Sequence, residues 1–230
     1  LFRSVFLSAV SIHRPRPSRP VGRKRTQTMD WSRASACLYN PAMTPPYWQQ
    51  AVAHLSKTDT VMAQLIASYP HASLVSRGDP FLTLVRSVVG QQISVRAADA
   101  IWSRLQETVP GISPTTILAH PAETLRQCGL SARKVEYLSD LARHFGNGQI
   151  HTHRWPTMSD AEIIKELTAV RGIGVWTAEM FLIFNQLRPD IFPLDDIGLQ
   201  KAVAKHYCAG ERPGRSQLIG IGERDRKSVV

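Results

Sequence analysis

Cysteine is scarce in this sequence of 230 residues, and the few cysteines present lie far apart. They are Cys37, Cys128 and Cys208. An odd number at such spacing argues against a disulfide framework, and no pair has the close spacing of a thiolate metal site. The sequence therefore favours a reducing, intracellular setting, because structural disulfides belong to oxidising compartments.

Long apolar runs are also missing. A membrane-spanning helix needs roughly 18 or more predominantly apolar residues in a row, and no stretch of the sequence approaches that length. We therefore expect a soluble protein with no membrane partner. The length of 230 residues is enough for one sizeable core or for two small ones.

Acidic residues are nearly absent from the first 40 residues. That segment holds eight lysines and arginines against a single acid, Asp30, so it carries seven of the ten net positive charges of the chain. The rest of the chain keeps a net charge of only three. A local basic face there could bind nucleic acid, but the total charge alone does not indicate it.

Residues 1–43 combine Arg, Ser and Pro without sustained periodicity, which predicts a disordered basic extension. Three interpretations stay open. The segment has the composition of a transit peptide, it has the charge of an arm that tethers DNA, and it is also consistent with translated sequence upstream of a true start at Met43. None of them bears on the fold of the remainder.

From Thr44 onward, apolar residues recur at helical spacing between capping signals. Ser94, Ser131 and the pair Ser159 with Glu162 have the pattern of N-caps, the last as a capping box. No segment alternates with period two over a convincing length. The sequence therefore predicts an all-α fold of about nine or ten helices, without internal repeats.

The most informative stretch is a pair of helices joined by a short glycine-containing turn. An apolar stripe predicts a helix over Asp160–Val170, and a second helix begins at Val175. Gly172 and Gly174 permit positive φ and close backbone approach. The amides of Gly172, Gly174 and Val175 would point outward at a helix N-terminus, where they can bind an anion such as phosphate. A GxG turn alone is more often an ordinary interhelical connection.

The residues around this turn carry a specific resemblance. LTAVRGIGVWTAEMFLIF followed by FPLDDIGLQKAV, together with PFLTLVRSVVGQQISVRAADAIWSRL and GLSARKVEYLSDLA, resembles the helix-hairpin-helix DNA glycosylase superfamily, and within it the DNA-3-methyladenine glycosylase II branch. The likeness covers Tyr47 to Gly222. It implies two helical subdomains flanking a cleft, one spanning 80–188 as a barrel and the other joining 44–79 to 190–230.

The resemblance also implies site residues. Asp196 matches the catalytic aspartate that opens the helix after the hairpin, which leaves Asp195 as a helix cap or a supporting partner. Trp176 stands where bifunctional relatives have a nucleophilic lysine, so hydrolysis without strand cleavage is expected. Trp176 would line the base pocket, with Met180 as a further wall; the alternative for Trp176 is an ordinary core position.

DNA contacts follow from the same resemblance. Gln91 or Gln92 matches the residue that fills the hole left by an extruded base, and Lys134 is expected to contact phosphate or to be simply solvated. A monovalent cation, Na⁺ or K⁺, is expected at the carbonyls of Thr168, Val170 and Ile173. No other cofactor is expected, and His13, His120, His151 and His153 lack the spacing of metal ligands.

The sequence thus predicts a monofunctional DNA glycosylase that hydrolyses the N-glycosidic bond of alkylated bases such as 3-methyladenine in duplex DNA, acting as a monomer. It would work in the cytoplasm or nucleoid of a bacterium, or in the nucleus or an organelle of a eukaryote. The alternative is a non-catalytic DNA-binding protein that uses the same hairpin. A bifunctional enzyme for oxidised bases is disfavoured by Trp176 and by the missing iron–sulfur cysteines. Residues 224–230 depart from the family's aromatic-rich final helix, as a truncation or a shifted reading frame would produce.

Overall fold

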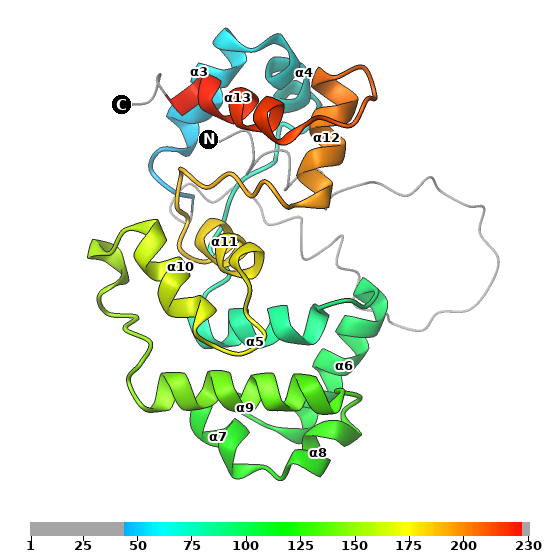
Figure 1. The fold of residues 1–230 in the computed structure, drawn as a ribbon, viewed down its shortest axis with the longest axis vertical. Helices are drawn as coiled ribbons and strands as arrows, with labels where there is room; N and C mark the ends of the chain where they lie inside the picture. Colours follow the sequence, from blue (N-terminus) through cyan, green and yellow to red (C-terminus); the bar gives the residue numbers. More distant parts are fainter. Residues whose placement is uncertain (1–43, 227–230) are drawn as a thin grey trace, which may run out of the picture. The chain divides into compact units, whose positions relative to one another are not determined.

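The computed structural model describes residues 44–226, and the segments 1–43 and 227–230, including the predicted basic extension, lie outside the described residues. Within 44–226 the chain forms eleven α-helices and one short 3₁₀ helix, with no β-strand (Figure 1). The predicted all-α class is therefore confirmed, with slightly more helices than the sequence indicated. None of the described helices is long and apolar enough to cross a membrane.

The chain divides into two compact units with boundaries at Val75/Ser76 and Arg188/Pro189. Unit 1 contains α3 (Trp48–Thr58), α4 (Thr60–Ser68), α12 (Ile197–Tyr207) and α13 (Arg215–Arg226). Unit 2 contains α5 (Pro80–Gly90), α6 (Val95–Thr108), α7 (Pro114–Ala119), α8 (Ala122–Gln127), α9 (Ala132–Gly146), η1 (Trp155–Thr157), α10 (Asp160–Thr168) and α11 (Val175–Phe184).

Local capping sets most helix starts in the way the sequence predicts. The hydroxyls of Ser94 and Ser131 accept the amides of Ala97 and Lys134, which begins α6 and α9. Ser159 and Glu162 form the predicted capping box at the start of α10. Each of these bonds satisfies a backbone donor that the helix itself leaves without a partner. Because the cap and its partner are only three residues apart, the sequence alone identifies the start of the helix.

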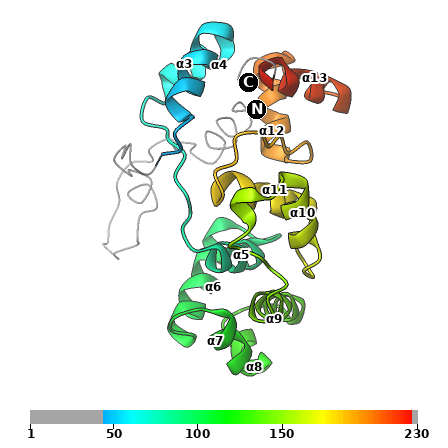
Figure 2. The ribbon, with the colours of Figure 1, turned by 90° about the vertical axis from the view of Figure 1, so that its left-hand side faces the viewer.

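The core of unit 2 is built around α9 and α11. α9, seen end-on in Figure 2, packs against α5, α7 and α8. α11 is apolar on nearly every side and buries Phe181, Leu182, Ile183 and Phe184. Phe181 meets the ring of Trp155 edge-on at 5.2 Å between centroids. A helix this apolar must lie largely inside its unit, and its exposed residues, Val175 and Trp176, are in its first turn.

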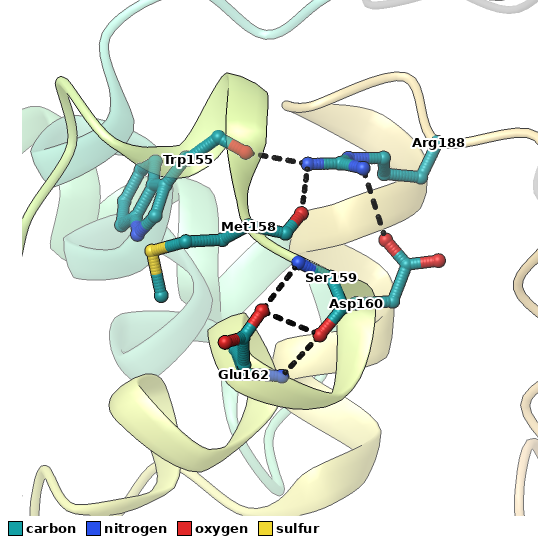
Figure 3. Close-up of polar contacts among 6 residues, drawn as sticks. All are labelled: Trp155, Met158, Ser159, Asp160, Glu162 and Arg188. Atoms are coloured by element: carbon teal, nitrogen blue, oxygen red, sulfur yellow. Dashed lines mark hydrogen bonds and ion pairs between the residues drawn. The ribbon is translucent and has the colours of Figure 1, made fainter.

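Arg188, the last residue of unit 2, ties the end of the unit to the start of α10 (Figure 3). Its Nη2 donates to the carbonyls of Trp155 at 2.6 Å and Met158 at 3.0 Å, and its Nη1 lies 3.5 Å from Oδ1 of Asp160. Figure 3 shows the Ser159–Glu162 capping box directly beside this cluster. The guanidinium has five donors in a planar fork, so one side chain holds both the connection before α10 and its first residue.

Asp59 links the N-terminal and C-terminal segments of the chain within unit 1. Its Oδ1 accepts the amide of Met62 and so caps α4, while its second oxygen accepts the hydroxyl of Tyr207 at 2.9 Å. The end of α12 is thereby fixed to the start of α4. The region Leu218–Glu223, just before the residues that depart from the family pattern, lies within α13. Gly222 in this helix packs closely on Phe192, because a Cβ on Gly222 would come within 3.1 Å of the Phe192 ring.

Candidate functional site

The glycine turn connects α10 to α11 in the predicted order, but the two glycines differ. α10 ends at Thr168, two residues earlier than predicted, and the amide of Ile173 bonds to the carbonyl of Val170 at 3.1 Å. Gly172 has φ +83°. Gly174 has φ −91° and ψ 172°, so of the two glycines only Gly172 uses the left-handed conformation that glycine permits. Extended backbone at this point is what an N-cap adopts, because the helix begins at the next residue.

The N-terminus of α11 fits the predicted anion site. Gly174 is its N-cap and contributes no side-chain hydrogen bond to the first-turn amides. Val175 and Trp176 follow directly and are 54% and 45% exposed. The amides of a first turn carry the positive end of the helix dipole, and they bind an anion where no capping side chain accepts them.

Three side chains from elsewhere in unit 2 hold the turn in place. Nε2 of Gln91 donates to the carbonyl of Gly172 at 2.8 Å. Oδ2 of Asp140 accepts the amide of Arg171 at 2.9 Å. The ring of Tyr137 packs so closely on Gly172 that a Cβ there would overlap its carbon atoms. Sequence reasoning did not identify Tyr137 and Asp140, although their spacing places them on one face of the predicted helix with Lys134.

The two glutamines of the α5–α6 loop have separate roles. Gln91 is half-buried and its side chain is directed to the turn, so of the two residues predicted to fill a vacated base position, Gln92 is the exposed one. Gln92 has φ 55°, in the left-handed region. The neighbouring Ile93 and Val95 are 38% and 77% exposed. The loop therefore presents Gln92 in a strained backbone conformation, with two exposed apolar side chains shortly after it.

Lys134 is engaged within the protein, which neither prediction for it foresaw. Its Nζ donates to the carbonyls of Val89 and Gln91, both at 2.8 Å, and so satisfies the C-terminal end of α5. Partial burial lowers the pKa of the Lys134 ammonium. The expectation of a solvated lysine is therefore wrong. An ammonium has three donors, and a phosphate contact by this residue stays a prediction.

Trp176 lies on the surface rather than in the core. It is 45% exposed on the first turn of α11, whereas the following Thr177 and Ala178 are buried. Met180, one turn further on and therefore on the same face, is half-buried. The alternative of an ordinary core tryptophan is excluded by this exposure. The role of the two residues in holding a base stays a prediction.

In unit 1, Asp196 rather than its neighbour Asp195 is the cap of α12. Oδ1 of Asp196 accepts the amide of Leu199 at 2.6 Å, so Asp196 is the N-cap of α12. Asp195 lies 3.1 Å from Nη1 of Arg215, with both side chains largely exposed. The prediction that Asp195 caps this helix is wrong. Asp196 and the turn belong to different units, and their predicted meeting at a cleft stays a prediction.

Among residues 44–226, no three or more His, Cys, Asp or Glu side chains lie together in a group that could hold a metal ion. Glu166 accepts three hydrogen bonds, from the His151 amide, the His151 ring and Nε1 of Trp155, at 2.7 to 2.9 Å. Burial of Glu166 opposes ionisation, but these hydrogen bonds outweigh it and lower the pKa of the carboxyl. This network fixes the connection between α9 and α10 and gives the His151 ring a hydrogen-bond partner within the protein.

The predicted monovalent cation would use backbone carbonyls of the turn. The Val170 carbonyl accepts the Ile173 amide, and a carbonyl oxygen has a second lone pair for a cation. Thr168 is the last residue of α10, so its carbonyl lies at a helix C-terminus, where cations are favoured. The donor set fits Na⁺ or K⁺, and the site stays a prediction.

Comparison with known proteins gives one matching family model, described as the HhH-GPD superfamily base excision DNA repair protein, over residues 85–221. The chain is 34% identical over 158 residues to DNA-3-methyladenine glycosylase 1 of Schizosaccharomyces pombe, covering 66% of this chain and 69% of that protein. It is 29% identical over 183 residues to the putative DNA-3-methyladenine glycosylase YfjP of Bacillus subtilis, covering 76% of this chain and 63% of that protein.

A solved structure shows the same fold. The Schizosaccharomyces pombe 3-methyladenine DNA glycosylase Mag1 in complex with abasic DNA matches with a TM-score of 0.65 and 30% identity, covering 76% of this chain and 88% of that chain. The chain thus spans about two thirds of the length of the two curated relatives and most of this solved structure.

Proposed function

Because the chain belongs to the helix-hairpin-helix superfamily of base excision DNA repair proteins, we propose that it is a monofunctional DNA glycosylase. Its reaction is hydrolysis of the N-glycosidic bond of alkylated bases, such as 3-methyladenine, in duplex DNA. The observation that carries the proposal is the exposed Trp176 on the first turn of α11, at the position where bifunctional relatives have a lysine. An indole cannot form a Schiff base with the sugar, so the strand is left unbroken.

Binding to duplex DNA rests on the hairpin. The open N-terminus of α11 offers the amides of Gly174 and Val175 to a backbone phosphate. Such contacts carry no sequence information, which suits an enzyme that must examine every position of the duplex. The proposed partner is duplex DNA alone, with the protein acting as a monomer and without a cofactor beyond the monovalent cation at the turn.

Catalysis requires extrusion of the damaged nucleotide and cleavage of the bond between C1′ and the base nitrogen. As this bond breaks, its electron pair moves to the base, and positive charge develops on the sugar. The Asp196 carboxylate stabilises that charge and accepts a proton from the water that adds to C1′. A base made cationic by alkylation leaves as a neutral molecule, so no acid is needed to protonate it.

The proposal is tested with duplex DNA treated with a methylating agent. The wild-type protein is expected to release 3-methyladenine and to leave abasic sites that break only on heating or alkali treatment. Nicks that appear without heat or alkali would contradict monofunctional chemistry. Binding to the same DNA with no base released would instead identify the chain as a non-catalytic DNA-binding protein, a role consistent with Asp196 serving only as the cap of α12.

Trp176 is expected to set the preference for cationic bases. A cation over an indole gains about 0.5 to 2 kcal/mol, so Trp176→Leu should lower kcat/KM for 3-methyladenine by roughly 2- to 30-fold relative to a neutral base such as hypoxanthine. Trp176→Phe keeps an aromatic face, so its preference for the cationic base should lie between those of the wild-type protein and Trp176→Leu. The measurement is the ratio of the two kcat/KM values for each variant. An equal loss on charged and neutral bases would show that Trp176 contributes shape rather than charge recognition.

A further inference from the structure

The α5–α6 loop and the glycine turn are joined by side chains that the proposed chemistry does not use. Gln91 and Gly172 are 81 residues apart in sequence, yet the Gln91 side chain bonds to the Gly172 carbonyl at 2.8 Å. The carbonyl of Gln91 in turn accepts Nζ of Lys134 at 2.8 Å. Tyr137, one turn after Lys134 on α9, also packs on Gly172. We call Gln91, Lys134 and Tyr137 the brace.

The brace connects the two parts of unit 2 that would touch DNA differently. One is the turn, whose amides would hold a phosphate. The other is Gln92, the exposed residue directly after Gln91, which would fill the position of an extruded base. Since Gln91 is bonded through its side chain to the turn and through its carbonyl to α9, the main chain on which Gln92 stands cannot shift independently of the turn.

The backbone conformation of Gln92 indicates that the surrounding structure holds this residue in place. Its φ of 55° is costly for a residue with a Cβ, by roughly 1 to 2 kcal/mol. Such a conformation persists only where the surroundings over-determine it. The contacts that fix the backbone on its N-terminal side are those of Gln91, and on its C-terminal side the next anchor is the Ser94 cap of α6.

We propose that the brace fixes the spacing between the wedge residue Gln92 and the phosphate-binding turn, so that Gln91 and Lys134 are positioning residues for base extrusion. This inference rests on the proposed function. A wedge enters the duplex at one base step while the turn holds one phosphate, and these two contacts can be made together only at a fixed separation. Loss of the brace should therefore affect recognition of a vacated base position more than binding to intact duplex.

The experiment measures binding without chemistry. The probe is a duplex containing a tetrahydrofuran analogue of an abasic site, compared with the same duplex undamaged, and the readout is the ratio of the two dissociation constants. Gln91→Met keeps the length of the side chain and removes its donor. The matched control is Gln106→Met, an exposed position near the end of α6. We expect Gln91→Met to reduce the preference for the tetrahydrofuran duplex by about 3- to 10-fold, as for the loss of one hydrogen bond, and Gln106→Met to leave it unchanged.

A double-mutant cycle separates positioning from general destabilisation. Gln92→Gly removes the wedge and suits the left-handed backbone. In that background Gln91→Met should change the preference by less than about 2-fold, because Gln91 would act through Gln92. An equal effect of Gln91→Met with and without the wedge would overturn the proposal. If Gln91→Met does not fold, Lys134→Met replaces it in the cycle, with Lys134→Arg expected to restore the preference because it keeps the donors.

Failure of the two proposals would look different. If the wild-type protein releases no 3-methyladenine from methylated duplex, the proposed function falls, and the brace falls with it. If it releases the base but binds both duplexes equally, there is no preference for Gln91 to set, and only the brace is wrong. If the wild-type protein prefers the tetrahydrofuran duplex and the Gln91→Met variant keeps that preference in full, only the brace is wrong.

Discussion

Replacing Asp196 by asparagine is expected to lower the rate of base release by at least about 100-fold while leaving the protein folded. Removal of a positioned base or of a group that stabilises developing charge typically costs about 10²-fold or more in rate. Asparagine is as good an N-cap as aspartate, so the bond from the Leu199 amide to the residue at position 196 is kept. The measurement is single-turnover release of 3-methyladenine from methylated duplex, together with the urea midpoint of each protein.

Asp195→Asn is the matched control for this prediction. It makes the same chemical change one residue earlier, at an exposed carboxylate paired with Arg215, where an ion pair contributes little. We expect its rate and stability to stay near those of the wild-type protein. Equal rates for the Asp196→Asn and wild-type proteins would remove Asp196 from the chemistry and leave it as a helix cap. A loss of rate in Asp195→Asn alone would move the catalytic role to its neighbour.

Replacing Gly172 by alanine is expected to destabilise the protein by about 2 to 5 kcal/mol. Two costs add at this residue. Its φ of +83° is unfavourable for any residue with a Cβ, by roughly 1 to 2 kcal/mol, and the new Cβ would overlap the ring of Tyr137, which adds an overpacking cost of roughly 1 to 3 kcal/mol. Urea unfolding at neutral pH measures the free energy directly.

Two other glycines separate these costs. Gly111 has φ +65° and open space where an alanine methyl group would lie, so Gly111→Ala should show the conformational cost alone. Gly174 has neither a positive φ nor a near neighbour, so Gly174→Ala should cost only the loss of glycine at an N-cap, about 1 kcal/mol or less. The expected order of destabilisation is Gly172, then Gly111, then Gly174. A Gly172→Ala protein no less stable than Gly111→Ala would show that Tyr137 yields without cost and does not fix the turn.

Local signals account for what could be read from the chain alone. The helix starts at Ser94, Ser131 and Ser159 depend on a side chain bonding to an amide three residues later, so sequence spacing is enough to find them. The all-α class follows from apolar periodicity in the same way, since each amphipathic segment carries its own pattern. The glycine turn was also identifiable, because it lies between two such segments.

Local signals could not assign different roles to adjacent residues of the same type. Asp195 and Asp196 are both good N-caps, and Gln91 and Gln92 are both polar loop residues, so propensity cannot rank either pair. For the glutamines the choice is made by a distant partner, because the Gly172 carbonyl accepts the Gln91 side chain. For the aspartates, Asp196 caps α12 and Asp195 pairs with Arg215 at the surface. Likewise Gly174 has the same chemistry as Gly172, but the helix that follows it requires an extended cap rather than a left-handed turn.

Helix formation and the cap positions of this protein thus depend on interactions within a few residues, so the sequence predicts them. The family likeness is carried by short sequence motifs and can be recognised in the same way. The roles of Gln91 and Lys134 come from contacts across 43 or more residues, and the packing of Tyr137 on Gly172 gave no signal of its own. The reason is physical: a hydrogen bond or a ring contact between distant segments depends on how three helices pack, and no single segment carries that information.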